Sequence, residues 1–263
     1  MREILNDEFT GPQEADPVRR AQIQMKKHLP KRFYQTVGVS PGEDGHAIVL
    51  DGKPVRTPGR NSLAVPSAEL AALIAAEWQA QEKLIDPATM PLTRLVNTAI
   101  DAVATQTEEV FEDIVRYAGN DLMFYRADTP RELVARQAEH WDPMIAWAAS
   151  DLGARFVLTE GVIHVAQPAA AIEAYAAALR RYPTHFELAC LHVMTTLTGS
   201  ALLPLALAEG RLTLEQAWTL AHVDEDWTVE HWGTDAEAIA RNAKRFEDMQ
   251  AAASVFQLVR RSD

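Results

Sequence analysis

With 263 residues, the chain is long enough for one large domain or two unequal ones, each with its own core. Hydrophobic residues make up 48% and charged residues 24%, a balance that excludes a disordered or fibrous chain. The net charge of −12 argues against nucleic acid and against anionic membrane surfaces, since both require clustered Lys and Arg. A basic or apolar protein partner is compatible with this charge.

The N-terminal sequence and the single cysteine indicate a reducing compartment. Residues 1–10 contain three acidic residues and no apolar stretch, so neither a secretory signal nor a transit peptide is expected. The longest apolar run, at residues 201–208, is too short to span a bilayer. Cys190 lies among apolar residues and is expected in the core. We therefore expect a cytoplasmic protein with no membrane insertion.

A small β domain is predicted over residues 31–66, after a flexible N-terminal arm at residues 1–30. Turn sequences separate β-forming stretches, and Asp51-Gly52 is typical of a two-residue hairpin loop. Four short strands are expected, at residues 33–39, 46–50, 55–57 and 63–65. Such a sheet needs another element to cover its apolar face.

Residues 67–263 are predicted to form a larger, mainly α-helical domain. Ser67 is a favourable N-cap, and the apolar residues after it recur at helical spacing. Further helices are expected after Pro91 and after Thr107, the latter ending at a C-terminal cap formed by Gly119. The predicted fold class is therefore α+β.

Capping sequences and prolines mark the later helices. Thr129-Pro130-Arg131-Glu132 predicts a capping box with Pro at the first helical position, and Asp142-Pro143 should bend or restart that helix. Helices are also expected from Pro168 and from Thr184. Two more capping boxes, Thr213 with Gln216 and Thr234 with Glu237, open the last two helices. Between the helix that starts near Thr129 and the one that starts at Pro168, residues 155–158 and 162–166 are predicted to form a short β-hairpin inside the helical domain.

No catalytic or nucleotide-binding motif stands out in the sequence. The twelve glycines are scattered singly in turns, so no phosphate-binding loop is present and no cofactor is expected. Gly199-Ser200 lacks the flanking pattern of a nucleophile elbow. Cys190 and His192 are two residues apart on a helix and therefore point in different directions.

The strongest candidate for a site is the segment from His222 to His231. Together with Asp224 and Asp226, these two histidines have the chemistry of metal ligands, which leaves a metal-dependent hydrolase as an alternative function. On a helix, however, Asp224 points away from the face that His222 and Asp226 could share. A solvated acidic patch is the plainer interpretation, and no metal is expected.

A helical projection places Glu225 at the centre of an apolar stripe. The stripe consists of Leu214, Trp218, Ala221, Glu225, Val229 and Trp232. A buried carboxylate costs several kcal/mol unless it is paired. Two interpretations remain open: Glu225 forms a buried ion pair with Arg94 or Arg116, or the stripe borders an open surface where Glu225 engages a partner.

The tryptophans bear on the same question. The chain has six, at positions 78, 141, 147, 218, 227 and 232. Most are expected to be core residues. Any that is exposed would mark a binding face, because aromatic residues are enriched at interface hot spots.

Several short motifs follow one another along the chain. In the first half they are Lys31-Arg32-Phe33-Tyr34, Leu50-Asp51-Gly52-Lys53-Pro54, Thr57-Pro58, Glu77-Trp78 with Gln81, Met90-Pro91-Leu92-Thr93-Arg94-Leu95 and Thr98-Ala99-Ile100-Asp101. In the second half they are Trp141-Asp142-Pro143, Thr198-Gly199-Ser200, Asp224-Glu225-Asp226-Trp227 and Trp232-Gly233. In this order the series resembles the F1-ATPase assembly chaperone family that binds the α subunit, which includes mitochondrial ATP synthase assembly factor 2 and bacterial relatives. The match covers roughly residues 31–245.

The resemblance implies a molecular chaperone without catalytic chemistry. Members of the family bind the free α subunit of the ATP synthase F1 sector and prevent its aggregation before the α/β hexamer forms. An acidic residue that is important in the family falls in the segment matching residues 224–226, and the projection singles out Glu225. The partner-binding residues expected from this match are Asp224, Glu225, Asp226, Trp227 and Trp232. Without a transit peptide, a bacterial, monomeric member is expected; a permanent component of a larger complex is the remaining alternative.

Overall fold

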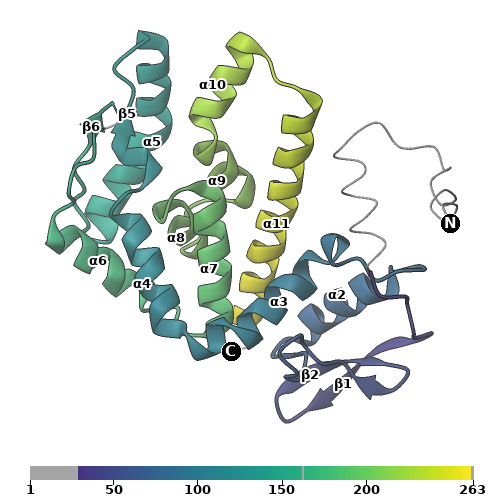
Figure 1. Ribbon diagram of the computed structural model, residues 1–263. Helices are drawn as coiled ribbons and strands as arrows, with labels where there is room; N and C mark the ends of the chain where they lie inside the picture. Colours follow the sequence, from purple (N-terminus) through teal and green to yellow (C-terminus); the bar gives the residue numbers. More distant parts are fainter. Residues whose placement is uncertain (1–28, 162, 262–263) are drawn as a thin grey trace, which may run out of the picture.

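A small sheet precedes an array of helices in the computed structural model, which describes residues 29–161 and 163–261 (Figure 1). The predicted arm therefore lies almost entirely outside the described residues. Strands come first and helices follow over most of the chain, which confirms the α+β class. None of the helices within the described ranges has the length and apolar character that crossing a bilayer requires.

The N-terminal sheet has four antiparallel strands, the number that the sequence predicts, but the first begins four residues later than predicted and the third lies before residues 55–57. They are β1 (Val37–Gly42), β2 (Gly45–Leu50), β3 (Lys53–Pro54) and β4 (Ala64–Val65). The central strand β2 pairs with all three others. Gly45 needs its missing side chain, because φ is +105° and a Cβ would lie 2.5 Å from the carbonyl oxygen of Val65. The loop between β2 and β3 is the predicted Asp51-Gly52, with both residues at positive φ.

Helix α2 (Ala68–Gln79) covers one face of this sheet (Figure 1). It begins where predicted, since the Ser67 hydroxyl accepts a hydrogen bond from the Leu70 amide at 3.2 Å. Its buried residues Leu70 and Ile74 belong to the same apolar cluster as Ile48 of the sheet and the interior of the helical part. The core is thus continuous from the sheet into the helices.

The helical part is built around α7 (His185–Thr198), which packs against α3 (Pro91–Asp101), α4 (Thr107–Ala118) and α11 (Ala236–Arg260). Most of α7 is buried, and Cys190 is fully buried in it, as expected. The remaining helical elements are η1 (Pro87–Thr89), η2 (Val103–Thr105), η3 (Leu122–Phe124), α5 (Arg131–Asp151), α6 (Ala169–Leu179), α8 (Leu202–Ala208), α9 (Leu214–Ala221) and α10 (Val223–Trp232).

The prediction of a β-hairpin formed by residues 155–158 and 162–166 is wrong. Instead, β6 (Thr159–Glu160) pairs in parallel with β5 (Tyr125–Arg126), a strand that the sequence analysis did not identify. The side-chain amide of Gln167 pairs with the backbone of Val157: it accepts a hydrogen bond from the N–H at 2.8 Å and donates one to the carbonyl at 2.9 Å. Because that side chain substitutes for a partner strand, Val157 needs no hairpin neighbour.

Two predicted caps and one predicted break also differ from the structure. Pro130 is the N-cap of α5 and no side chain caps that helix, so the Thr129 capping box does not form. Helix α5 continues through Pro143, since the buried Trp141 and Trp147 on either side hold it in the core. The N-cap of α11 is Asp235, one residue later than predicted.

A buried carboxylate joins the start of η3 to the start of α8. Asp121 is fully buried, and its Oδ2 accepts from the Ser200 hydroxyl at 2.7 Å and from the amides of Ala201 and Leu202 at 2.8 and 3.0 Å. Its Oδ1 accepts from the Met123 amide at 3.1 Å. Burial raises the pKa of Asp121 to about 6, so the group remains ionised at pH 7.5.

Replacing this carboxylate tests how much the junction contributes to stability. In Asp121→Asn an amide NH₂ must face at least one backbone N–H, because both carboxylate oxygens accept from the backbone. We expect the free energy of unfolding, measured with urea at pH 7.5, to fall by about 3 kcal/mol. The exposed Asp128→Asn should change it by less than about 0.5 kcal/mol. Equal stability of the two variants would contradict this account of Asp121.

Candidate functional site

The predicted apolar stripe is divided between two helices. Helix α9 ends at His222, whose φ of −114° and ψ of 16° are not helical, and α10 begins at the next residue. The His222 ring stabilises this break, since its Nδ1 lies 2.7 Å from the carbonyl oxygen of Trp218. A projection that assumes one continuous helix is therefore wrong beyond Ala221.

Glu225 lies on the open side of α10. Its side chain is 63% exposed, and its ion-pair contact within the described residues is with His222, whose Nε2 lies 3.5 Å from Oε2. Arg94 pairs with Asp248 and Arg116 pairs with Asp113, so neither arginine reaches Glu225. The interpretation of a buried ion pair is wrong, and the carboxylate is free to meet a partner.

The opposite side of α10 is fixed to α5 by polar side chains. The buried Gln137 donates to Asp224 at 2.7 Å and accepts from the Ala127 amide at 2.8 Å. Arg136 donates two hydrogen bonds to Glu230, at 2.6 and 2.9 Å. These bonds raise the pKa of Arg136 and lower the pKa of Glu230. Asp224 is thus tied to the protein more firmly than Glu225.

Aromatic side chains gather at the C-terminal end of α10. Trp227 stacks on His231 at 4.0 Å between ring centroids and meets Trp232 edge-on at 5.3 Å. Trp232 is 73% exposed; Val229 of the same helix and Ile239 in the first turn of α11 are exposed as well. Trp141 and Trp147 are buried, and Trp78 and Trp218 are partly buried against the core. Trp232 is the exposed tryptophan that the sequence argument required for a binding face.

The structure brings the five predicted partner-binding residues together on one short helix. Asp224 faces α5, so we give the name α10 surface to Glu225, Asp226, Trp227, Val229 and Trp232. The sequence analysis missed Ile239, which follows on α11, and the two α5 residues that orient the helix. Spacing alone could not find them, because the contacts join segments far apart in the sequence.

Metal binding by the same segment has no support in the geometry. The described part of the chain contains no group of three or more His, Cys, Asp or Glu side chains placed to hold a metal ion. Among the four candidate ligands, Asp224 is bound to Gln137. His222 and His231 each have Nδ1 2.7 Å from the backbone carbonyl four residues earlier.

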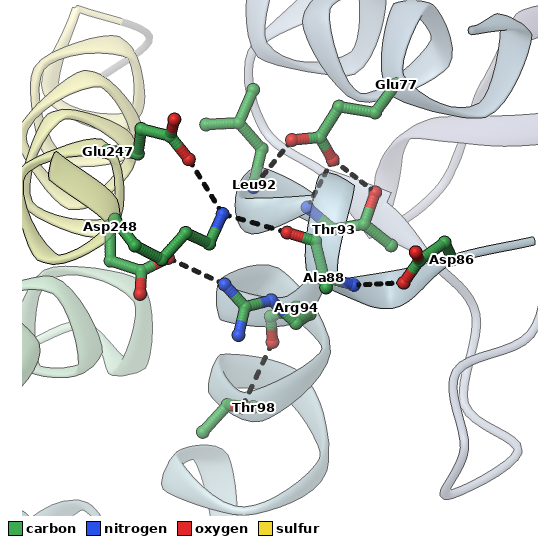
Figure 2. Close-up of polar contacts among 10 residues, drawn as sticks. Glu77, Asp86, Ala88, Leu92, Thr93, Arg94, Thr98, Glu247 and Asp248 are labelled. Carbon is green, nitrogen blue, oxygen red and sulfur yellow. Dashed lines mark hydrogen bonds and ion pairs between the residues drawn. The ribbon is translucent and has the colours of Figure 1, made fainter. Parts of the chain in front are cut away.

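A second polar cluster lies where α2, α3 and α11 meet, and Figure 2 shows its contacts. Glu77 of α2 caps α3: its carboxylate accepts from the amides of Leu92 and Thr93, both at 2.8 Å, and from the Thr93 hydroxyl at 2.7 Å. Burial raises the pKa of Glu77 despite these three donors. Because the carboxylate satisfies amides at a helix N-terminus, it ties the start of α3 to the end of α2.

The same cluster ties α11 to the start of α3 (Figure 2). Lys244 donates to the carbonyl of Ala88 at 2.8 Å, and Arg94 donates to Asp248 at 2.6 Å. Arg94, which the sequence analysis considered as a partner for Glu225, therefore links helices at this junction instead.

One family model and two solved proteins are similar to this chain. The family model described as ATP12 chaperone protein matches residues 31–149. A candidate chaperone from Agrobacterium tumefaciens is 55% identical, with a TM-score of 0.85 over 94% of this chain and 92% of that one. Atp12 from Paracoccus denitrificans is 42% identical, with a TM-score of 0.81 over 88% of this chain and 98% of that one. A variant of the Paracoccus protein with an aspartate replaced by lysine gives the same identity and TM-score.

The Glu77 cap can be tested by hydrogen exchange. In Glu77→Gln one carboxylate oxygen becomes an NH₂ group facing a backbone N–H, so we expect the amides of Leu92 and Thr93 to exchange faster, by about tenfold for a loss of about 1.4 kcal/mol. Glu82→Gln, an exposed change nearby with no hydrogen bond in the described residues, is the matched control. Unchanged exchange at both amides in Glu77→Gln would rule out the capping role.

Proposed function

We propose, since the chain belongs to the ATP12 chaperone family, that it binds the free α subunit of the ATP synthase F1 sector and prevents its aggregation before the α/β hexamer forms. The family membership agrees with the resemblance of the sequence motifs. The observation that carries the proposal is the likeness to Atp12 from Paracoccus denitrificans, which spans 98% of that chain at 42% identity.

The α10 surface has the chemistry that this task requires. A subunit that normally sits in a ring exposes an apolar interface when it is alone, and exposed apolar patches lead to aggregation. Trp232 and Val229 offer apolar area to such an interface. The exposed carboxylate of Glu225 offers a contact for a basic group beside it. Charged groups next to apolar contacts favour specificity and exchange over raw affinity, which suits a partner that must later be displaced.

We further propose that α5 keeps the α10 surface in place without covering it. Gln137 and Arg136 bind the carboxylates of Asp224 and Glu230 on one side of the helix. Glu225 and Trp232 are then left for the client, and no bond is made or broken in the process. The action proposed is stoichiometric binding by a monomer in the cytoplasm of a bacterium.

Charge reversal at the centre of the α10 surface tests the proposal. We expect Glu225→Lys to reduce co-purification of the ATP synthase α subunit by about tenfold, since a basic client group would then meet a like charge. Glu225→Gln should give an intermediate loss. Glu173→Lys, the same change at an exposed position of α6, is the control and should capture α like the unaltered chain.

The outcome depends on the fold being retained in each variant. Glu225 lies in the first turn of α10 and contacts His222, so Glu225→Lys should lower the free energy of unfolding by about 1 kcal/mol, while circular dichroism should still show the folded chain. In the Paracoccus relative, the fold accommodates replacement of an aspartate by lysine. Full capture of α by Glu225→Lys, or equal capture of the β subunit by the unaltered chain, would show the proposal to be wrong.

A further inference from the structure

A second exposed aromatic residue borders a groove on the small sheet, far from the α10 surface. Phe33 is 73% exposed, as much as Trp232. It lies at the edge of a groove of about 530 Å³. The lining residues used below, which we call the sheet groove, are Phe33, Tyr34, Lys53, Pro54, Arg56 and Trp78. In Figure 1 the sheet and α10 lie at opposite ends of the molecule.

The neighbours of Phe33 are held by polar contacts, whereas Phe33 itself is mostly exposed. Arg32 donates to the carbonyls of Tyr34, Gln79 and Gln81, which fastens this segment to the end of α2. Tyr34 is buried, and its hydroxyl donates to the Trp78 carbonyl at 2.7 Å. With its neighbours held in this way, Phe33 is left mostly in solvent, and its ring contact within the described residues is the edge-on one with Tyr34.

The rings beneath Phe33 continue its apolar surface into the groove. Phe33 meets Tyr34 edge-on at 5.4 Å between centroids, and Tyr34 meets Trp78 in the same way at 5.8 Å. Three of the motifs that carry the family resemblance, at residues 31–34, 50–54 and 77–78, contribute residues to this lining. Segments far apart in the sequence therefore converge on one concave, largely apolar site.

The rim of the sheet groove has the opposite charge to the rest of the molecule. Residues 31–66 contain five basic and three acidic residues, in a chain whose net charge is −12. Among the described residues, no carboxylate pairs with Lys53 or Arg56. The one acidic residue of the lining, Asp51, accepts hydrogen bonds from the Thr36 and Gln35 amides, which lower its pKa and favour its ionised form. With Lys53 and Arg56 (two positive charges, one negative) the lining keeps a net charge of +1. The rim thus favours an acidic partner.

We propose that the sheet groove binds an extended segment of the client in which an apolar side chain is flanked by carboxylates. The apolar side chain would pack on Phe33 and Trp78, and the carboxylates would meet Lys53 and Arg56. This inference rests on the proposed chaperone function for the identity of the client. It adds a second contact whose charge preference is opposite to that of the α10 surface, so that the client is held at both ends of the molecule.

The groove chemistry can be tested without the client, by fluorescence anisotropy of labelled peptides. The first probe is a short peptide with a Phe-Leu pair between aspartates, and the second has lysines in place of the aspartates. The unaltered chain should bind the acidic peptide, more weakly at high salt, and ignore the basic one. Phe33→Ala and Lys53→Glu should each weaken binding by about tenfold. Ile163→Ala, at another strongly exposed apolar position, should not.

The outcomes separate this inference from the proposed function. No binding of the acidic peptide, equal binding of both peptides, or unchanged binding by Phe33→Ala would overturn the groove proposal. Sedimentation that shows a dimer of the unaltered chain and a monomer of Phe33→Ala would overturn it in favour of a second copy as occupant. In α capture, Phe33→Ala should lose about tenfold while Ile163→Ala loses nothing. If the unaltered chain captures no α but shows Phe33-dependent peptide binding, the proposed function fails and the groove chemistry stands.

Discussion

The pairing of α10 with α5 is the interaction on which the candidate site depends. Gln137 is buried and bound at both ends of its amide, so it fixes Asp224 and with it the rotation of α10. Arg136 binds Glu230, which lies further along α10 than Asp224, and so fixes the same rotation. Given this rotation, Glu225 and Trp232 face solvent. If apolar residues made this contact instead, the apolar face of α10 would turn toward the core and Trp232 would be buried.

Local signals in the sequence were sufficient for most of the fold. Ser67 and Thr213 cap helices as predicted, because an N-cap is decided by a hydroxyl and an amide three residues away. The pairing of β5 with β6 was not predicted, because the two strands lie more than 30 residues apart in the sequence. Strands of two residues are also too short to show an alternating apolar pattern. At the site, sequence reasoning treated residues 214–232 as one helix, whereas the structure has two. The break at His222 depends on a side-chain contact with the Trp218 carbonyl, which no apolar pattern records.

The protein has two exposed surfaces of opposite charge, the α10 surface and the sheet groove. Both combine an exposed aromatic residue with charged groups, acidic at α10 and basic at the sheet groove. Between them, Glu77 and Lys244 hold the sheet, α3 and α11 in fixed relative positions, as the contacts in Figure 2 show. A rigid body with two separated contacts can bind one client more specifically than either contact alone, while each remains weak enough to be displaced.

Light scattering of isolated α subunit, diluted from denaturant in the presence of increasing amounts of this chain, tests the central claim most directly. If the chain acts by covering apolar surface, scattering should fall and level off at equimolar chain, without added nucleotide, while scattering of the β subunit should be unaffected. Persistent aggregation of α at a molar excess of folded chain, or equal protection of β, would contradict the account.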